Sequence, residues 1–278
     1  MEDTQWRLLD TGYRSSAENM AIDEGILIAH SEGKVPPTIR FYGWNPPTLS
    51  IGYFQKAEKE VNLSALQDRE LGFVRRPTGG RAVLHDQEIT YSVVVREDYP
   101  GMPHTVTESY KVISTGLLHG FRQLNMQAEM IPLESEEEKE KYVSPGSSAC
   151  FDSPSHYELV VEGRKVAGSA QTRQRGVILQ HGSILLDLDV DLLFDILRFP
   201  SKEIRERMKR GFLNKAVAIN QIRSESVTYE QARQAFTQGF TDGMNIDLKR
   251  GTLTPYENEW VQKLIQDRYG NNEWNLKK

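Results

Sequence analysis

The chain has 278 residues, a formal net charge of −5, 38% hydrophobic residues and 26% charged residues. This composition supports a sizeable core and argues against global disorder, and the length suits one large domain or two small ones. The negative charge argues against a nucleic-acid partner, which would require a basic face. The sequence lacks both a membrane-spanning apolar run and the basic and apolar segments of a secretory signal, so we expect a cytoplasmic protein with no membrane partner.

The first part of the sequence predicts one helix followed by several strands. Ser15 and Glu18 have the spacing of a capping box, and apolar residues at helical spacing follow them as far as Ile28. After Pro36 the pattern becomes strand-like, with a short helix at 62–69. The predicted strands are Thr38–Tyr42, Thr48–Phe54, Phe73–Arg76, Ala82–His85 and Ile89–Val95.

The second part of the sequence becomes increasingly helical. Its predicted elements are a helix at Ser109–Leu124, a hairpin of Tyr157–Gly163 and Lys165–Ala170, one or two strands within Gly176–Asp187, and helices at Val190–Phe199 and Ser201–Phe212. Capping boxes that begin at Thr228 and Thr254 predict two more helices. The order of elements indicates an α+β fold with mixed or antiparallel sheets flanked by helices, and a helical C-terminal appendage.

Cys150 is the only cysteine, so it cannot form an internal disulfide or a multi-cysteine metal site. It is either a small buried residue, which is the usual case, or a nucleophile. Residues 144–154 are rich in Pro, Gly and Ser, which predicts a loop, and reactive groups often lie on loops. We therefore favour a reactive thiol, and a single cysteine is also typical of the reducing cytosol.

A glycine motif lies between two of the predicted strands. It spans Arg75–Asp86 and contains the pair Gly79 and Gly80. Because glycine has no side chain, backbone N–H groups can approach a ligand here, and neighbouring arginines suit a phosphate or a carboxylate. A plain hairpin with a glycine turn and solvated arginines explains the same residues equally well.

A second motif, Gly163–Ala170, has only a superficial likeness to a P-loop. Gly168 is followed by Ser169 and then alanine, whereas a P-loop needs Lys and then Ser or Thr. Lys165 lies among small and apolar residues and is either exposed on the outer face of the sheet or directed into a site. In the second case its ammonium group, close to a thiol, would favour the thiolate and lower the cysteine pKa.

Three histidines are alternative partners for the thiol, namely His85, His156 and His181. A Cys–His pair would suit a thiol protease, but no flanking sequence matches a protease signature. The chain contains no HExxH motif or comparable spacing, so we predict no metal site.

Taken together, these motifs resemble the superfamily of lipoate–protein ligases, octanoyltransferases and biotin–protein ligases. The resemblance rests on Arg75–Asp86 followed by Gly163–Gln171, on the opening strands Arg40–Trp44 and Leu49–Gln55, and on the late strands Gln180–Asp187. It implies a catalytic domain with the class II synthetase-like fold of this superfamily.

The resemblance covers roughly residues 5–220. We therefore expect a single catalytic domain over residues 1–278, with its core at about 5–220 and a helical C-terminal extension at about 221–278. The sequence contains nothing that demands a dimer, so a monomer is expected.

The cysteine selects a branch of this superfamily. Ala149 to Asp152 resembles the octanoyltransferases of Gram-positive bacteria, in which the cysteine precedes the lysine as Cys150 precedes Lys165. This implies transfer of octanoyl from acyl carrier protein to a lysine of the glycine cleavage H protein or a lipoyl domain, without a cofactor. Arg81 replaces the third glycine of ATP-dependent ligases, which favours a reaction without ATP. An ATP-dependent lipoate–protein ligase, an octanoyl amidotransferase between lipoyl domains and a non-catalytic acyl-binding module remain alternatives.

The resemblance also implies the roles of individual residues. Cys150 would form a thioester with octanoyl, and Lys165 would keep its thiol ionised. The candidate substrate-binding residues are Arg76, Thr78, Gly79, Gly80, His85, Gly168 and Ser169.

Overall fold

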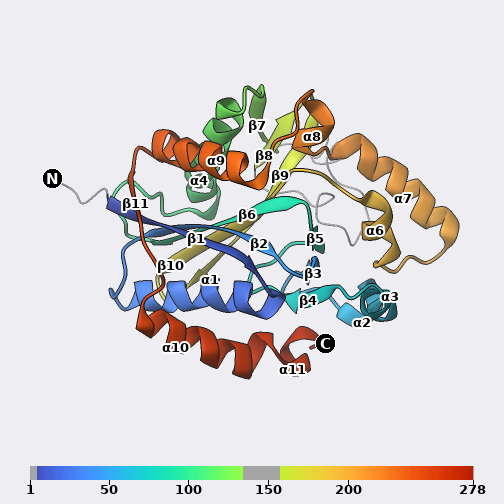
Figure 1. The fold of residues 1–278 in the computed structure, drawn as a ribbon, viewed down its shortest axis with the longest axis horizontal. Helices are drawn as coiled ribbons and strands as arrows, with labels where there is room; N and C mark the ends of the chain where they lie inside the picture. Colours follow the sequence, from blue (N-terminus) through green and yellow to red (C-terminus); the bar gives the residue numbers. More distant parts are fainter. Residues whose placement is uncertain (1–4, 134–156, 278) are drawn as a thin grey trace.

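The computed structural model describes residues 5–133 and 157–277. Its strands are β1 Gln5–Arg14, β2 Thr38–Trp44, β3 Thr48–Ile51, β4 Gly72–Arg75, β5 Val83–His85, β6 Glu88–Arg96, β7 Ala128–Pro132, β8 Tyr157–Val161, β9 Arg164–Gln174, β10 Val177–Leu185 and β11 Asp247–Arg250. Eight of them form a large sheet in the order β11-β1-β2-β6-β10-β9-β8-β7, and three form a small sheet in the order β4-β3-β5. The large sheet crosses the middle of the molecule (Figure 1).

The large sheet is mixed. β1 runs parallel to both of its neighbours, β2 and β11. All other neighbouring strands of this sheet, from β2 through β6, β10, β9 and β8 to β7, pair in antiparallel fashion. In the small sheet β3 is parallel to β4 and antiparallel to β5. The predicted α+β class with mixed sheets is therefore confirmed.

Helices cover both faces of the large sheet (Figure 1). Their bounds are α1 Ser16–Ser31, α2 Ala57–Glu60, α3 Leu63–Asp68, α4 Val106–Gln123, α6 Val190–Asp195, α7 Lys202–Lys215, α8 Ile219–Ile222, α9 Tyr229–Met244, α10 Pro255–Leu264, the π-helical turn η2 Ile265–Tyr269, and α11 Asn272–Asn275. Helices α4 and α9 pack on one face, and α1 and α10 pack on the other. A separate apolar cluster joins the small sheet to α3, α6 and α7.

The predicted helix starts are confirmed by their caps. At Ser15, Thr228 and Thr254 the side-chain oxygen accepts a backbone N–H of the first helical turn. The side chain of the Glu or Gln three residues later accepts the backbone N–H of the cap residue. One predicted helix is shorter than expected: α6 ends at Asp195 instead of Phe199, because Leu197 forms a β-bridge with Val61.

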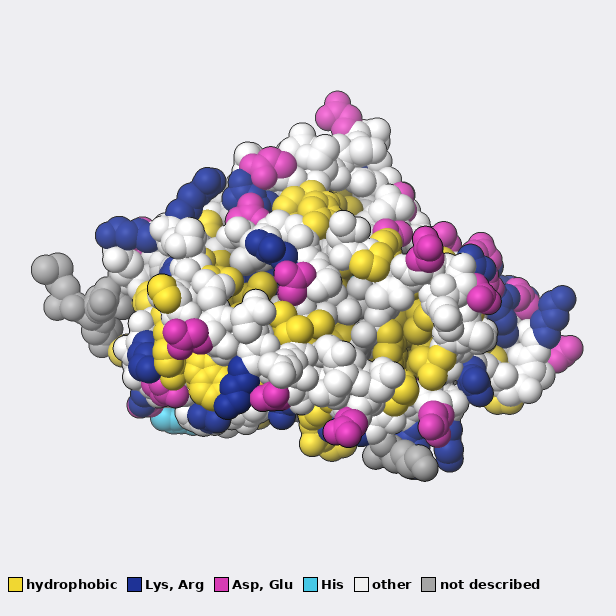
Figure 2. Space-filling view, turned by 60° about the horizontal axis from the view of Figure 1, so that its bottom comes forward, with side chains coloured by type: hydrophobic (Ala, Val, Ile, Leu, Met, Phe, Trp, Pro, Cys, Tyr) yellow, Lys and Arg dark blue, Asp and Glu magenta, His cyan; other side chains and the backbone are white. Residues whose placement is uncertain are grey.

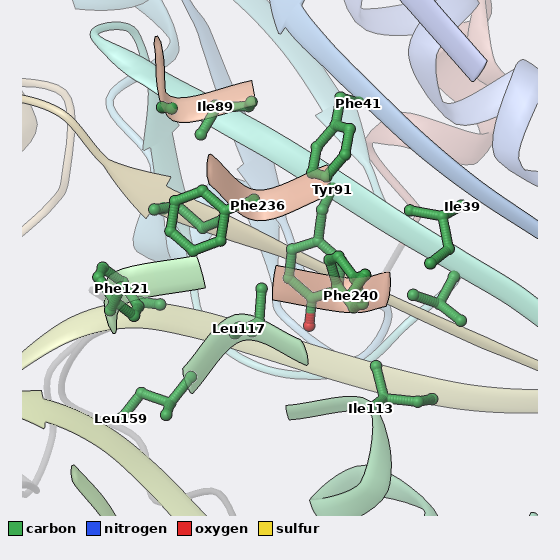
Figure 3. Close-up of a cluster of buried hydrophobic side chains, with 14 of the residues drawn as sticks. Ile39, Phe41, Ile89, Tyr91, Ile113, Leu117, Phe121, Leu159, Phe236 and Phe240 are labelled. Carbon is green, nitrogen blue, oxygen red and sulfur yellow. The ribbon is translucent and has the colours of Figure 1, made fainter. Parts of the chain in front are cut away.

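The main core lies between the large sheet and the pair α4 and α9. Figure 3 shows Phe240 of α9 lying against Phe41 and Tyr91 of the sheet, and the ring of Phe236 packs against Phe121 of α4. Each of these rings is fully buried, and burial of such a side chain contributes roughly 1.5–3 kcal/mol. The two helices can approach closely because Gly120 has no side chain. A Cβ atom at this position would lie only 2.1 Å from the Phe236 ring.

The C-terminal segment does more than add helices. Its strand β11 joins the edge of the large sheet, where Asp247 pairs with Gln5 and Arg250 with Leu8. Helix α10 packs against α1, and a buried ion pair between Glu257 and Arg7 fixes it there. The boundary expected near residue 221 stays a prediction.

The surface is mixed in charge. Figure 2 shows Lys and Arg side chains interspersed with Asp and Glu across the face that it displays. Within residues 5–133 and 157–277, no helix has both the length and the apolar character needed to cross a bilayer.

Candidate active site

A pocket lies where the glycine motif faces β9 and β10. Four of the predicted binding residues line it, namely Arg76, His85, Gly168 and Ser169. The remaining described lining residues are Met20, Tyr42, Trp44, Val83, Thr90, Ala170, His181, Gly182 and Ser183. The wall is therefore largely apolar, with imidazole and hydroxyl groups at a few points.

His85 is held rigidly in this wall. Its Nδ1 lies 2.8 Å from Glu88 Oε1, and its Nε2 lies 2.7 Å from Ser50 Oγ. The indole ring of Trp44 stacks on the imidazole, with ring centroids 4.2 Å apart. Because both nitrogens and one ring face are occupied, the side chain presents a fixed surface to the pocket.

His181 joins the pocket to the glycine motif. Its Nε2 lies 2.7 Å from Thr78 Oγ1, and its Nδ1 lies 3.2 Å from Asp23 Oδ2. Burial lowers the pKa of His181, with Arg76 and His85 acting in the same direction, so the imidazole is neutral at neutral pH. Since the carboxylate of Asp23 can only accept, Nδ1 carries the proton and Nε2 accepts the hydroxyl of Thr78.

Asp23 is the centre of a buried polar network. Its Oδ1 lies 2.7 Å from Arg40 Nη1 and accepts the hydroxyl of Ser92, and its Oδ2 accepts the hydroxyl of Tyr42. Burial alone would raise the pKa of Asp23, but Arg40, His181 and Ser92 outweigh burial and hold it below the usual range. The network fixes helix α1 against β2 and β6 at the edge of the pocket.

Arg76 gives the glycine loop its shape. One end of its guanidinium donates to the carbonyl and hydroxyl oxygens of Ser50, at 3.0 and 2.7 Å. The other end donates to the carbonyl oxygens of Gly79 and Arg81, at 3.0 and 2.8 Å. Gly80 has a φ of +90°, a conformation that favours glycine. Thr78 contacts His181 and Gly79 contacts Arg76, so both lie next to residues that line the pocket, and Gly80 follows them in the loop.

A neighbouring glycine is required for this loop to fit. A Cβ atom at Gly52 would lie 2.0 Å from the carbonyl oxygen of Gly80. The amide of Tyr53 also donates to the carbonyl of Thr78 at 2.8 Å. Gly52 and Tyr53, directly after β3, therefore hold the glycine loop in position.

Lys165 is buried rather than exposed on the outer face of the sheet. Its side chain is 4% exposed, and its Nζ lies 2.8 Å from Glu158 Oε2 and 3.1 Å from Oε1. Lys165 is not among the described residues that line the pocket. Cys150 and His156 lie outside the described residues.

Sequence reasoning missed several residues of the site. Asp23 and Glu88 lie outside the motifs, and Ser50 lies in an opening strand but carries no signal of a site residue. Asp23 and Ser50 act through partners distant in the chain, His181 and His85, whereas Glu88 contacts His85 three residues before it. A weak local signal existed for Asp23, because it interrupts the apolar face of α1, and for Arg40, because it stands inside an otherwise apolar strand. Among residues 5–133 and 157–277, no group of three His, Asp or Glu side chains could hold a metal ion.

Comparisons with known proteins agree with this geometry. A family model described as the lipoyl protein ligase A/B catalytic domain matches residues 15–241. A protein of Brevibacillus brevis named octanoyltransferase LipM is 63% identical over 274 residues, which is 99% of each chain. A protein of Bacillus subtilis with the same name is 59% identical over the whole of both chains.

Solved structures with the same fold are also similar. A bipartite lipoate protein ligase from Thermoplasma acidophilum, described with its E2 lipoyl domain, has a TM-score of 0.81 and 25% identity, covering 99% of this chain and 96% of that one. A lipoate-protein ligase A bound with ATP has a TM-score of 0.76 and 27% identity, covering 99% of both chains.

Proposed function

Because the chain belongs to the family of lipoyl protein ligase A/B catalytic domains, we infer that it is an octanoyltransferase of protein lipoylation. The observation that carries this conclusion is its identity of 59–63% with two octanoyltransferases over essentially the whole chain. The superfamily, the fold and the acyltransferase activity expected from the motifs are confirmed. An apolar pocket beside the glycine motif is the kind of site that an octanoyl chain needs.

The donor that we propose is octanoyl-acyl carrier protein, and the acceptor is a lysine of the glycine cleavage H protein or another lipoyl domain. The described pairing of an archaeal ligase with an E2 lipoyl domain supports an acceptor of the lipoyl type. We place the reaction in the cytoplasm, because a lone reactive thiol must stay reduced.

The chemistry that we propose has two steps. The thiolate of Cys150 attacks the thioester carbonyl of the donor, which forms octanoyl-Cys150 and breaks the bond to the carrier sulfur; the carrier leaves as a thiolate and takes a proton from water. The uncharged amine of the acceptor lysine then attacks this thioester, and Cys150 leaves as the thiolate while the amine loses a proton. The first step exchanges one thioester for another, and the second forms a more stable amide. Neither step needs ATP.

We assign the binding of the acyl group to the pocket. Arg76, Thr78, Gly79, Gly80, His85, Gly168 and Ser169 are the proposed binding residues. Their fixed hydrogen bonds support this role, because a pre-organised site loses little entropy when the substrate binds. Lys165 is proposed to favour the thiolate of Cys150 by its positive charge.

An assay without ATP tests the function. Incubation with octanoyl-acyl carrier protein should add the mass of one octanoyl group to the protein, and hydroxylamine should remove it. Addition of H protein should then give octanoyl-H protein.

A matched arm with free octanoate and ATP addresses the ligase alternative, which the similarity to an ATP-bound ligase raises. Product in that arm alone would contradict the transferase. The same assay with octanoyl-H protein as the donor and a lipoyl domain as the acceptor tests the alternative of an octanoyl amidotransferase.

Substitution of Gly52 by alanine tests the glycine loop. The new methyl group would collide with the carbonyl of Gly80, so the loop must leave its present position. We expect the rate of octanoyl transfer to fall roughly ten- to a hundredfold, because small displacements of a binding group are costly. Circular dichroism should show a folded protein. A folded variant with the activity of the natural protein would contradict the assignment of this loop to the site.

A further inference from the structure

Arg75 has an unusual environment for a charged side chain. It is fully buried, and its guanidinium makes six contacts at hydrogen-bond distance, all with backbone carbonyl oxygens. Three of the carbonyls belong to the segment after β3, and three to the C-terminal end of the described chain. The distances are 3.1, 3.0 and 2.6 Å to Gly52, Tyr53 and Gln55, and 3.1, 3.2 and 3.0 Å to Trp274, Asn275 and Lys277.

The backbone of Arg75 is bound to the same C-terminal residues. Its N–H donates to Asn275 Oδ1 at 3.0 Å, and its carbonyl accepts the indole N–H of Trp274 at 2.9 Å. Strand β4 is the edge of the small sheet, so these groups would otherwise lack a strand partner. Asn275 is itself fixed, because its Nδ2 donates to the carbonyl of Tyr269.

A buried arginine would be an unfavourable choice if this position required only a side chain of suitable volume. A buried charge costs much free energy unless its hydrogen bonds are satisfied, and an apolar side chain of similar volume would avoid that cost. Burial lowers the pKa of Arg75, although the nearby Glu60 acts in the opposite direction. What an apolar side chain cannot do is hold two separate segments by their carbonyl oxygens.

One of those segments supports the active site. Gly52 lies directly against Gly80, and Tyr53 donates to the carbonyl of Thr78. Thr78 in turn contacts His181 in the wall of the pocket. A continuous chain of contacts therefore runs from the C-terminal residues through Arg75 to the glycine loop.

We propose that Arg75 and Trp274–Lys277 form a clamp that holds the glycine loop in its acyl-binding position. Arg75 is a positioning residue in this clamp and does not itself contact the substrate. The C-terminal residues are accordingly part of the working site, although they lie far from its motifs in the sequence. The effect on acyl transfer rests on the proposed function, whereas the effect on the loop does not.

Two variants test the clamp, Asn275→Ala and a chain that ends at Gly270. Helix α10 should stay in place in both, because Glu257 still pairs with Arg7, and Glu24 still binds Arg268 and Tyr269. We expect amide hydrogen exchange in residues 51–55 and 76–81 to accelerate by about tenfold or more, while exchange in α4 and α9 stays unchanged. The single-turnover rate of Cys150 acylation should fall roughly ten- to a hundredfold.

Glu273→Ala is the matched control, because Glu273 is exposed on the same short helix. It should change neither the exchange nor the acylation rate. Unchanged exchange in residues 76–81 of both test variants would overturn the proposal, as would acylation at the natural rate. If the natural protein failed to accept octanoyl, the proposed function would be wrong, and the exchange measurement would still decide the clamp.

Discussion

Cys150→Ala is expected to abolish octanoyl transfer. Removal of a catalytic nucleophile typically lowers a rate by about four to six orders of magnitude, because the covalent intermediate can no longer form. Mass spectrometry of the H protein after incubation with octanoyl-acyl carrier protein measures this loss. The hydroxylamine-sensitive adduct on the enzyme should disappear with it.

The serine variant at the same position serves as a comparison. An octanoyl ester on Cys150→Ser would not argue against the mechanism, since a hydroxyl can be acylated slowly. Full turnover by Cys150→Ala would contradict it directly. Equal unfolding temperatures of the natural protein and the alanine variant would show that the loss is chemical.

Lys165→Met has the second large expected effect, and it acts in two ways. Loss of the ammonium group should raise the pKa of the Cys150 thiol, so the pH profile of iodoacetamide alkylation should move to higher pH. The same change leaves Glu158 buried without its lysine partner. Breaking a buried ion pair from one side costs about 3–5 kcal/mol of folding stability.

A double variant separates these two effects. Lys165→Met combined with Glu158→Gln removes both charges, and replacement of a whole buried pair is often nearly neutral for stability. The double variant should therefore regain most of its unfolding free energy in urea, while the alkylation profile stays shifted and transfer stays slow. Recovery of transfer by the double variant would show that Lys165 is needed only for folding.

The sequence predicted most of the fold because many of its elements begin or end with local chemistry. The capping boxes at Ser15, Thr228 and Thr254 located three helices, and runs of β-branched residues located β6 and β10. Strand β11 could not be found in this way. Its residues are exposed or half-buried and show no alternation, so only the parallel pairing with β1 makes it a strand.

The same distinction between local and distant signals applies to the residues of the candidate site. Arg76, Thr78, His85, Gly168 and Ser169 belong to contiguous motifs, and the structure brings them to the pocket or its edge. Their supporting residues come from other elements, as Asp23 does for His181 and Glu88 does for His85. Arg75 shows the limit of motif reasoning, because its neighbours in the motif say nothing of its contacts with Trp274–Lys277.

The pairing of β1 with β11 has a consequence for biosynthesis. β1 is synthesised before the other described strands, but its second neighbour in the sheet, β11, is the last of them. Until then one edge of β1 is open, and an open edge invites pairing with other chains. Pairing between such distant segments also slows folding. We therefore expect the yield of native protein from a bacterial expression host to increase when synthesis is slowed by cooling or when chaperones are co-produced.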